Sequence, residues 1–175
     1  FDTTSLFPDL EIVVIDAIFK STTVRFLLVY RAPHMDYNIS ASLVKAFHYF
    51  SNQNGPNVIL GDFNCPDIDW INSSSPSDLA QNVLHQYFLN FGFTQCVTRP
   101  TRGANILDIV CIDEPLLMSD IDLEAPFSSS DHDSVVFRIE INDGFSHDGK
   151  ENFQKIYDWR HGDYDSLVVY LNQVD

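Results

Sequence analysis

Residues 57–64 read Asn-Val-Ile-Leu-Gly-Asp-Phe-Asn, an apolar run that ends in glycine and then places two polar residues two positions apart. The apolar run predicts a short buried strand, and on an extended backbone Asp62 and Asn64 point to the same side. Gly61 allows backbone or a ligand to approach closely because it has no side chain. Polar residues at the carboxyl end of a core strand favour a ligand site, although an Asx turn after the strand would leave the same pattern.

The flanking sequence predicts strands and helices that alternate along the chain. Two apolar, β-branched runs at residues 10–19 and 24–30 are separated by turn residues and predict a hairpin. Apolar residues at helical spacing follow in 40–50, and a second helix is expected after residues 75–76, with serine as its N-cap and proline in its first turn. Further strands are predicted at residues 94–97, 106–112, near Ile121 and at 134–141. This alternation indicates an α/β fold of packed layers with some hairpin pairing.

The composition indicates one globular domain with an acidic surface. The chain has 175 residues, of which 45% are hydrophobic and 20% charged, enough for one hydrophobic core. Its net charge is −15, from 25 acidic and 10 basic residues, so tight DNA binding by this piece alone is not expected. Carboxylates clustered around a divalent cation would offset part of this charge locally. No apolar run approaches the roughly 18 residues of a membrane span and no signal peptide is visible, which favours an intracellular protein without membrane association.

Two polar motifs accompany the predicted downstream strands. Asp108 lies inside the apolar stretch 106–112, and a buried carboxylate needs a partner, for which a histidine is suited. If that strand lies at a sheet edge, Asp108 would instead face water. Ser-Asp-His at residues 130–132 precedes the strand predicted at 134–141 and combines a carboxylate with an imidazole that can transfer protons near neutral pH. A plain polar loop is the alternative interpretation of that run.

Tyr30 and Arg31 follow one another at the end of the strand predicted at residues 24–30, and Pro33 stops that strand. A hydroxyl and a guanidinium at a strand end could both contact a phosphate. The alternative is that Tyr30 packs at the rim of the core.

The order of these motifs resembles the endonuclease/exonuclease/phosphatase superfamily, which includes pancreatic-type deoxyribonuclease, apurinic-site endonucleases and retrotransposon endonucleases. The order is a tyrosine at a strand end, Gly-Asp-x-Asn, Leu-Asp in a strand and Ser-Asp-His before the final strand, and it covers residues 10–141. Pro-Thr-Arg at residues 100–102, followed by Leu-Asp at 107–108, is most similar to the endonuclease domains of LINE-type (non-LTR) retrotransposon polyproteins. The resemblance implies the C-terminal portion of a deoxyribonuclease-like four-layer α/β sandwich, with mixed sheets flanked by helices.

The resemblance also implies catalytic roles for five residues. Asp62 would activate or orient the attacking water, while Asn64 and Tyr30 would bind the scissile phosphate. His132 would stabilise the transition state or take a proton, with Asp108 orienting it. These roles match what phosphodiester cleavage needs, which is charge stabilisation on phosphate oxygens and a deprotonated water.

A metal and partners are implied in the same way. Asp131 would lie at the metal-binding end, and Arg31 and Ser130 would add substrate contacts. The expected ion is Mg²⁺, with Mn²⁺ as a substitute, because hard cations suit carboxylate and water ligands. The expected substrate is DNA, the expected neighbour in an intact polyprotein is a downstream reverse transcriptase domain, and the expected location is the nucleus.

The family pattern also sets the expected domain limits. Its early strand-borne asparagine and its metal-binding glutamate do not precede residue 10. We therefore expect residues 1–141 to be an endonuclease/exonuclease/phosphatase domain truncated at its N-terminus, and residues 142–175 to be a linker with a last helix at 163–171. The predicted function is metal-dependent phosphodiester hydrolysis by a DNA endonuclease. Two alternatives are a catalytically impaired remnant of that domain and a superfamily phosphoesterase that acts on small substrates.

Overall fold

The structure is a computed structural model that describes residues 3–19, 22–51, 54–72 and 74–141. All of these residues belong to one compact unit, residues 1–143. The linker predicted at residues 142–175, and the helix expected within it, lie outside the described residues.

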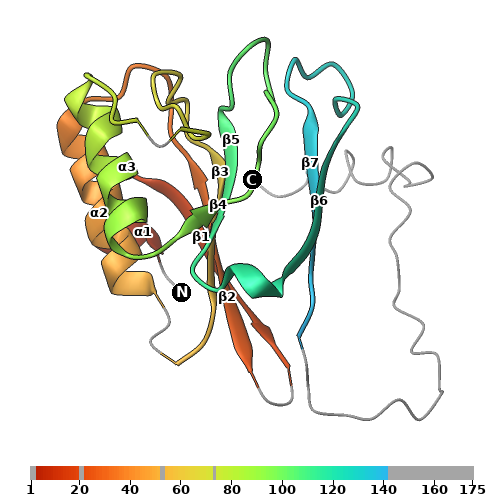
Figure 1. Ribbon diagram of the computed structural model, residues 1–175. Helices are drawn as coiled ribbons and strands as arrows, with labels where there is room; N and C mark the ends of the chain where they lie inside the picture. The colour runs from red at the N-terminus through yellow and green to blue at the C-terminus, as the bar shows by residue number, and fades with distance from the viewer. Residues whose placement is uncertain (1–2, 20–21, 52–53, 73, 142–175) are drawn as a thin grey trace, which may run out of the picture. The chain divides into compact units, whose positions relative to one another are not determined.

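A five-stranded mixed sheet forms the centre of this unit (Figure 1). Its spatial order is β1-β2-β3-β5-β4, in which β2 and β3 run parallel and the other neighbours are antiparallel. The hairpin predicted from the two β-branched runs is confirmed as the antiparallel pair β1–β2. The strand bounds are β1 Glu11–Ile18, β2 Thr23–Tyr30, β3 Asn57–Asp62, β4 Thr94–Gln95 and β5 Asp108–Ile112.

Helices cover one face of the five-stranded sheet (Figure 1). They are α1 Thr3–Leu6, α2 Tyr37–Phe50 and α3 Leu79–Asn90. The core beneath them is rich in aromatic rings, because Phe63 from the end of β3 packs between Phe47 of α2 and Phe88 of α3, at ring-centroid distances of 6.3 and 5.9 Å. This packing fixes the backbone that immediately follows β3.

A second sheet packs on the opposite face. It consists of β6 Met118–Glu124 and β7 Ser134–Ile139, an antiparallel pair preceded by the short 3-10 helix η1 Pro115–Leu117. Apolar residues that alternate along both strands, such as Leu123 and Phe137, pack with Val58 and Val110 of the five-stranded sheet. The predicted α/β fold, with mixed sheets flanked by helices, is therefore confirmed.

Among the predicted element boundaries that are wrong, two are explained by local hydrogen bonds. Helix α3 begins at Leu79 rather than after residues 75–76, because the side chain of Asp78 accepts the Gln81 amide at 2.8 Å and serves as the N-cap. Strand β4 is shorter than residues 94–97, because the Gln95 carboxamide bonds the amide and carbonyl of Val97 and takes the place of ladder partners.

An ion pair within the hairpin also contacts the end of α2. Arg25 donates through Nε and one Nη to both carboxylate oxygens of Asp16, at 2.7 and 2.8 Å, and through its other Nη to the Phe50 carbonyl at 2.8 Å. The hydrogen bonds from Arg25 are the main cause that lowers the pKa of Asp16 below its ordinary value. Stabilisation from this pair is therefore present above the pKa of the unfolded carboxyl and is lost as pH falls through the folded pKa.

Asp16→Asn is expected to lower the free energy of unfolding by about 1–2 kcal/mol at pH 7, because it removes a charge-assisted pair. Urea unfolding should show this loss at pH 7 and a shrinking difference from the wild type as the buffer is acidified. Asp120→Asn, on the exposed outer face of β6, is the matched control and should change stability by less than about 0.5 kcal/mol. A difference that stays constant with pH would contradict the assignment.

Candidate active site

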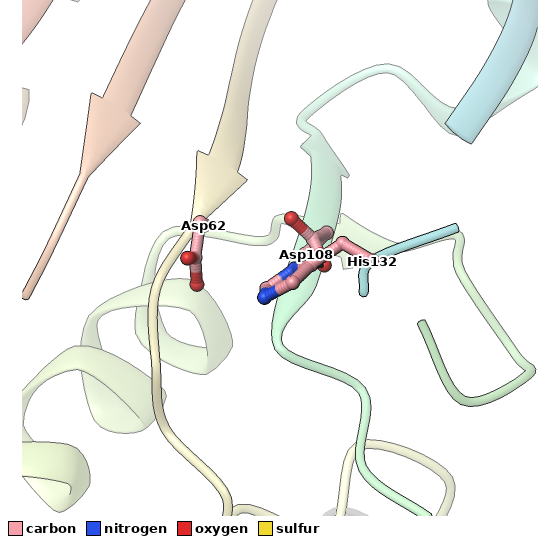
Figure 2. Close-up of side chains that lie close together, drawn as sticks. All are labelled: Asp62, Asp108 and His132. Carbon is pink, nitrogen blue, oxygen red and sulfur yellow. Dashed lines mark hydrogen bonds and ion pairs between the residues drawn. The ribbon is translucent and has the colours of Figure 1, made fainter. Parts of the chain in front are cut away.

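Three strand residues form a row across the five-stranded sheet. In the parallel pair β2–β3, Tyr30 is the partner of Asp62, and in the antiparallel pair β3–β5, Asp62 lies opposite Asp108. Paired residues project from the same face of a sheet, here the face that packs against β6 and β7. His132 reaches this row from the loop before β7, and Figure 2 shows its ring beside Asp108, with Asp62 close by.

Asp108 and His132 form the tightest contact of the site. His132 Nδ1 lies 2.7 Å from Asp108 Oδ2, and both side chains are about four-fifths buried, at 19% and 22% exposure. The histidine partner expected for Asp108 is therefore present. Asp108 is the first residue of β5 rather than a mid-strand residue as predicted, so its carboxylate lies at the sheet end where the loop of His132 passes. The contact through Nδ1 directs Nε2 away from Asp108, and Nε2 lies 3.9 Å from Asp131 Oδ1.

Asp62 is half-buried beside a second carboxylate. Burial is the main cause that raises the pKa of Asp62, and the charge of Asp108 raises it further. The amide of Asn64 donates to Asp62 Oδ1 at 3.1 Å, which opposes the shift. The group therefore holds its proton more readily than an exposed aspartate, as suits a side chain that takes a proton from water.

The donor atoms of the site fit a hard divalent cation. One ligand atom from each of Asp62, Asp108 and His132 lies within 4.8 Å of the others. Two carboxylates at this spacing repel one another, and a cation between them would relieve that repulsion. Oxygen donors of this kind match the coordination preference of Mg²⁺ and Mn²⁺.

Asn64 is placed at the site by a tight turn. Its φ of 45° is left-handed, and its side chain is 8% exposed. The Asx turn considered as the alternative interpretation is present, because the Asn64 amide bonds the side chain two residues back. Its carboxamide also donates to the Arg31 carbonyl at 3.0 Å, which ties the end of β3 to the end of β2.

Arg31 does not present its guanidinium to a substrate. The residue is 3% exposed. It donates to Ser40 Oγ and to the carbonyls of Met35, Phe63 and Asn64, at 2.7 to 3.3 Å. Because these bonds engage the guanidinium inside the protein, Arg31 holds the turn after β3 in place instead of making the predicted phosphate contact. Tyr30, by contrast, is 45% exposed and is the register partner of Asp62, so it is not buried in the core.

Ser130 and Asp131 lie on the exposed loop that carries His132. Ser130 Oγ accepts the amide of His132 at 3.0 Å and so shapes the turn that delivers the imidazole. Asp131 Oδ1 lies 3.9 Å from His132 Nε2, outside the group of Asp62, Asp108 and His132. The other Asp131 oxygen pairs with Arg102 at 2.7 Å, and the hydrogen bond from Arg102 is the main cause that lowers the pKa of Asp131.

Thr101 supports the site and was not predicted to do so. It is 1% exposed, and its Oγ1 accepts the amides of Leu107 and Asp108, both at 3.1 Å. Its carbonyl accepts the Asp133 amide at 2.8 Å, which connects the loop of His132 to the start of β5. The sequence feature that could have indicated this role is Pro-Thr-Arg at residues 100–102, because its threonine makes the contacts with Leu107, Asp108 and Asp133.

Thr101→Val keeps the shape of the side chain and removes its hydroxyl. We expect a loss of about 1–3 kcal/mol in the free energy of unfolding, because one buried amide and one partly buried amide lose their acceptor. Hydrogen exchange should report faster exchange at the amides of Leu107 and Asp108. Thr98→Val, on an exposed position of the same loop, is the matched control, and equal effects of the two variants would contradict the role of Thr101.

The comparisons with known proteins agree with this fold. The α/β fold, with Asp62, Asp108 and His132 grouped at one sheet end, matches the endonuclease/exonuclease/phosphatase class of proteins. A family model described as endonuclease-reverse transcriptase matches residues 24–136, and the chain belongs to that family. A comparison with curated proteins found no matching sequence.

Several solved structures share the fold. The endonuclease domain of TRAS1, a telomere-specific non-LTR retrotransposon, superposes with a TM-score of 0.60 at 17% identity, covering 74% of this chain and 64% of that one. A 3′-5′ exonuclease from Neisseria meningitidis gives a TM-score of 0.53 at 15% identity, covering 73% of this chain and 65% of that one. A 3′ phosphatase from Neisseria, bound to a product DNA hairpin, gives 0.52 at 17% identity with the same coverages, 73% and 65%. The deoxyribonuclease-like fold is thereby confirmed, and the chain spans just under two thirds of these structures.

Within the parts of the chain that the structure describes, no helix combines the length and the apolarity needed to cross a bilayer.

Proposed function

We propose that this chain carries the phosphodiester-hydrolysing centre of a divalent-metal-dependent DNA endonuclease associated with a reverse transcriptase. The observation that carries the proposal is the convergence of Asp62, Asp108 and His132 at one sheet end, in a chain of the endonuclease-reverse transcriptase family. The TRAS1 endonuclease domain, which shares the fold, supports a retrotransposon origin, and the Neisseria 3′ phosphatase, solved with a product DNA hairpin, supports DNA as the substrate.

The proposed acid–base catalysis follows from the contacts of the site. Asp62, half-buried at the end of β3 and opposite Asp108 in the sheet, orients the attacking water and takes its proton. Asp108 holds His132 through Nδ1, which leaves Nε2 to stabilise charge on the phosphoryl oxygens or to exchange a proton there. Tyr30 and Asn64, at the ends of their strands, would contact the phosphate, Asn64 through the carboxamide hydrogen that does not bond the Arg31 carbonyl.

The carboxylates of Asp62 and Asp108 would hold the metal, with Asp131 beside them. A bound Mg²⁺, or Mn²⁺ in its place, would polarise a phosphate oxygen and neutralise developing charge. Ser130 shapes the loop that brings both Asp131 and His132 to this end of the sheet.

The negative net charge of the chain affects its association with DNA. With a net charge of −15, long-range repulsion opposes association. We therefore propose weak, salt-sensitive DNA binding by this chain alone, with a downstream reverse transcriptase domain and a nuclear location in the intact protein.

The test is nicking of supercoiled plasmid by the 175-residue chain in low-salt buffer with Mg²⁺, with Mn²⁺, and with EDTA. We expect open-circular product that depends on the metal and decreases as salt is raised. Hydrolysis of bis-p-nitrophenyl phosphate without plasmid nicking would contradict the DNA assignment in favour of a small-substrate phosphoesterase. Failure with both substrates would contradict hydrolysis by this chain.

A further inference from the structure

Arg102 forms an ion pair at the edge of the candidate active site. Its Nε and Nη2 both contact Asp131 Oδ2, at 2.8 and 2.7 Å. The other oxygen of Asp131 lies 3.9 Å from His132 Nε2, so one side chain separates the guanidinium from the imidazole. Arg102 and Asp131 are 44% and 69% exposed, which leaves both open to a ligand.

The backbone under Arg102 is held rigidly. Arg102 and Asn105 exchange backbone hydrogen bonds of 3.1 and 3.0 Å across a turn in which Gly103 has a φ of 58°. The preceding Thr101 is buried and bonded to the start of β5. The guanidinium is therefore anchored beside the site and can change partner through side-chain rotation alone.

The other described arginines are placed differently. Arg25 pairs with Asp16 at the hairpin, and Arg31 is buried. Arg99 pairs with Asp122 of β6, and Arg138 lies on β7. Among the described residues, Arg102 is thus the arginine whose acidic partner touches the His132 imidazole. A phosphate that reaches His132 meets the charge of Arg102 at close range.

We propose that Arg102 exchanges between Asp131 and a DNA phosphate, and that this exchange releases the Asp131 carboxylate for the metal beside His132. The proposal rests on the function proposed above. A guanidinium that makes paired bonds to a phosphate no longer offers the same hydrogens to a carboxylate. DNA binding and metal binding then support each other, and the coupling acts equally in both directions.

Arg102→Gln tests the metal side of the exchange. Calorimetric titration of Mn²⁺ into the DNA-free 175-residue chain is expected to show affinity about two- to five-fold higher in the variant than in the wild type, because Asp131 is released and a positive charge is removed. Arg99→Gln removes the same charge from the same loop and frees Asp122 instead, so it controls for net charge. Its Mn²⁺ affinity should stay within about two-fold of the wild type.

Binding to a fluorescent DNA duplex in EDTA tests the phosphate side. Arg102→Gln should weaken binding about tenfold, and the slope of log affinity against log salt should fall by about 0.9, as expected for one lost phosphate contact. Arg99→Gln should retain more of the wild-type DNA affinity and more of the salt slope.

A separate measurement tests the coupling between the two ligands. In the wild type, DNA should raise the affinity for Ca²⁺, used here as a probe cation, and this increase should disappear in Arg102→Gln.

The outcomes separate this inference from the function on which it rests. Stronger Mn²⁺ binding with weaker DNA binding, confined to Arg102→Gln, supports the exchange. Equal effects of the two arginine variants, or unchanged Mn²⁺ affinity in Arg102→Gln, overturn the exchange while metal-dependent nicking by the wild type stands. A wild-type chain that binds neither Mn²⁺ nor DNA overturns both.

Discussion

Asp62→Asn is expected to lower metal-dependent nicking by about 10³-fold, the largest effect on activity of any substitution considered. Asparagine keeps an oxygen that can accept the Asn64 amide, which lies 3.1 Å from Asp62 Oδ1. It removes the negative charge opposite Asp108 and the ability to take a proton from water. The turn after β3 should therefore survive while the chemistry is lost.

The same variant should gain stability at neutral pH, because the pKa of Asp62 is raised in the folded protein by burial and by the charge of Asp108. For a carboxyl with a raised folded pKa, ionisation on going to neutral pH destabilises the fold, and asparagine avoids this loss. Loss of nicking together with a higher melting temperature would distinguish removal of a functional group from unfolding.

The measurements are single-turnover nicking rates and thermal melts at pH 7 for the wild type, Asp62→Asn and Asp120→Asn. Asp120 is exposed on β6 and away from the row, so its variant should leave both quantities nearly unchanged. A nicking rate of Asp62→Asn within tenfold of the wild type would remove Asp62 from the proposed mechanism.

Gly61→Ala should have the largest effect on stability. A Cβ at this position would lie 1.9 Å from the Val29 carbonyl oxygen, and the residue has a φ of +133°. Gly61 and Val29 are register partners in the parallel pair β2–β3, in the middle of the sheet. Neither backbone can retreat without breaking that ladder, so we expect a loss of more than about 4 kcal/mol in the free energy of unfolding, a large part of the stability of an ordinary domain.

Gly92→Ala is the matched control. Gly92 also has a left-handed φ, +71°, but an added Cβ meets nothing within 4 Å. It should therefore lose only the conformational term of about 1 kcal/mol. Urea unfolding followed by near-ultraviolet circular dichroism compares the two variants, and similar midpoints would contradict the close approach at Gly61.

The local pattern of the sequence determined the helices and strands of the fold and picked out Tyr30, Asp62 and Asp108, the residues that lie in a row across the sheet. The β-branched runs of β1 and β2 and the apolar stripe of α2 depend on near neighbours in the chain, so their periodicity is visible without a structure. The close approach at Gly61 was also readable, because glycine at the end of a buried strand has few other reasons to be there. The order of the polar motifs further indicated the superfamily, which the family model confirms.

Contacts between distant segments were decided only by the tertiary structure. The position of Arg31 at the end of a strand predicted that its guanidinium contacts a phosphate. In the structure this guanidinium is buried and donates to four acceptors, which come from α2 and from the loops after β2 and β3. Thr101 was known as part of a motif, but its hydroxyl acquires a role only where the chain returns at Leu107 and Asp108.

The site itself shows the same division. Asp62 and Asp108 were candidates from their surroundings in the sequence, and an antiparallel register of β3 and β5 places them directly opposite one another. The partner of Asp131 is Arg102, which no local pattern could pair with it. Residue type and periodicity are local properties of a chain, whereas the distance between two side chains depends on sheet register and loop packing, which the whole fold determines.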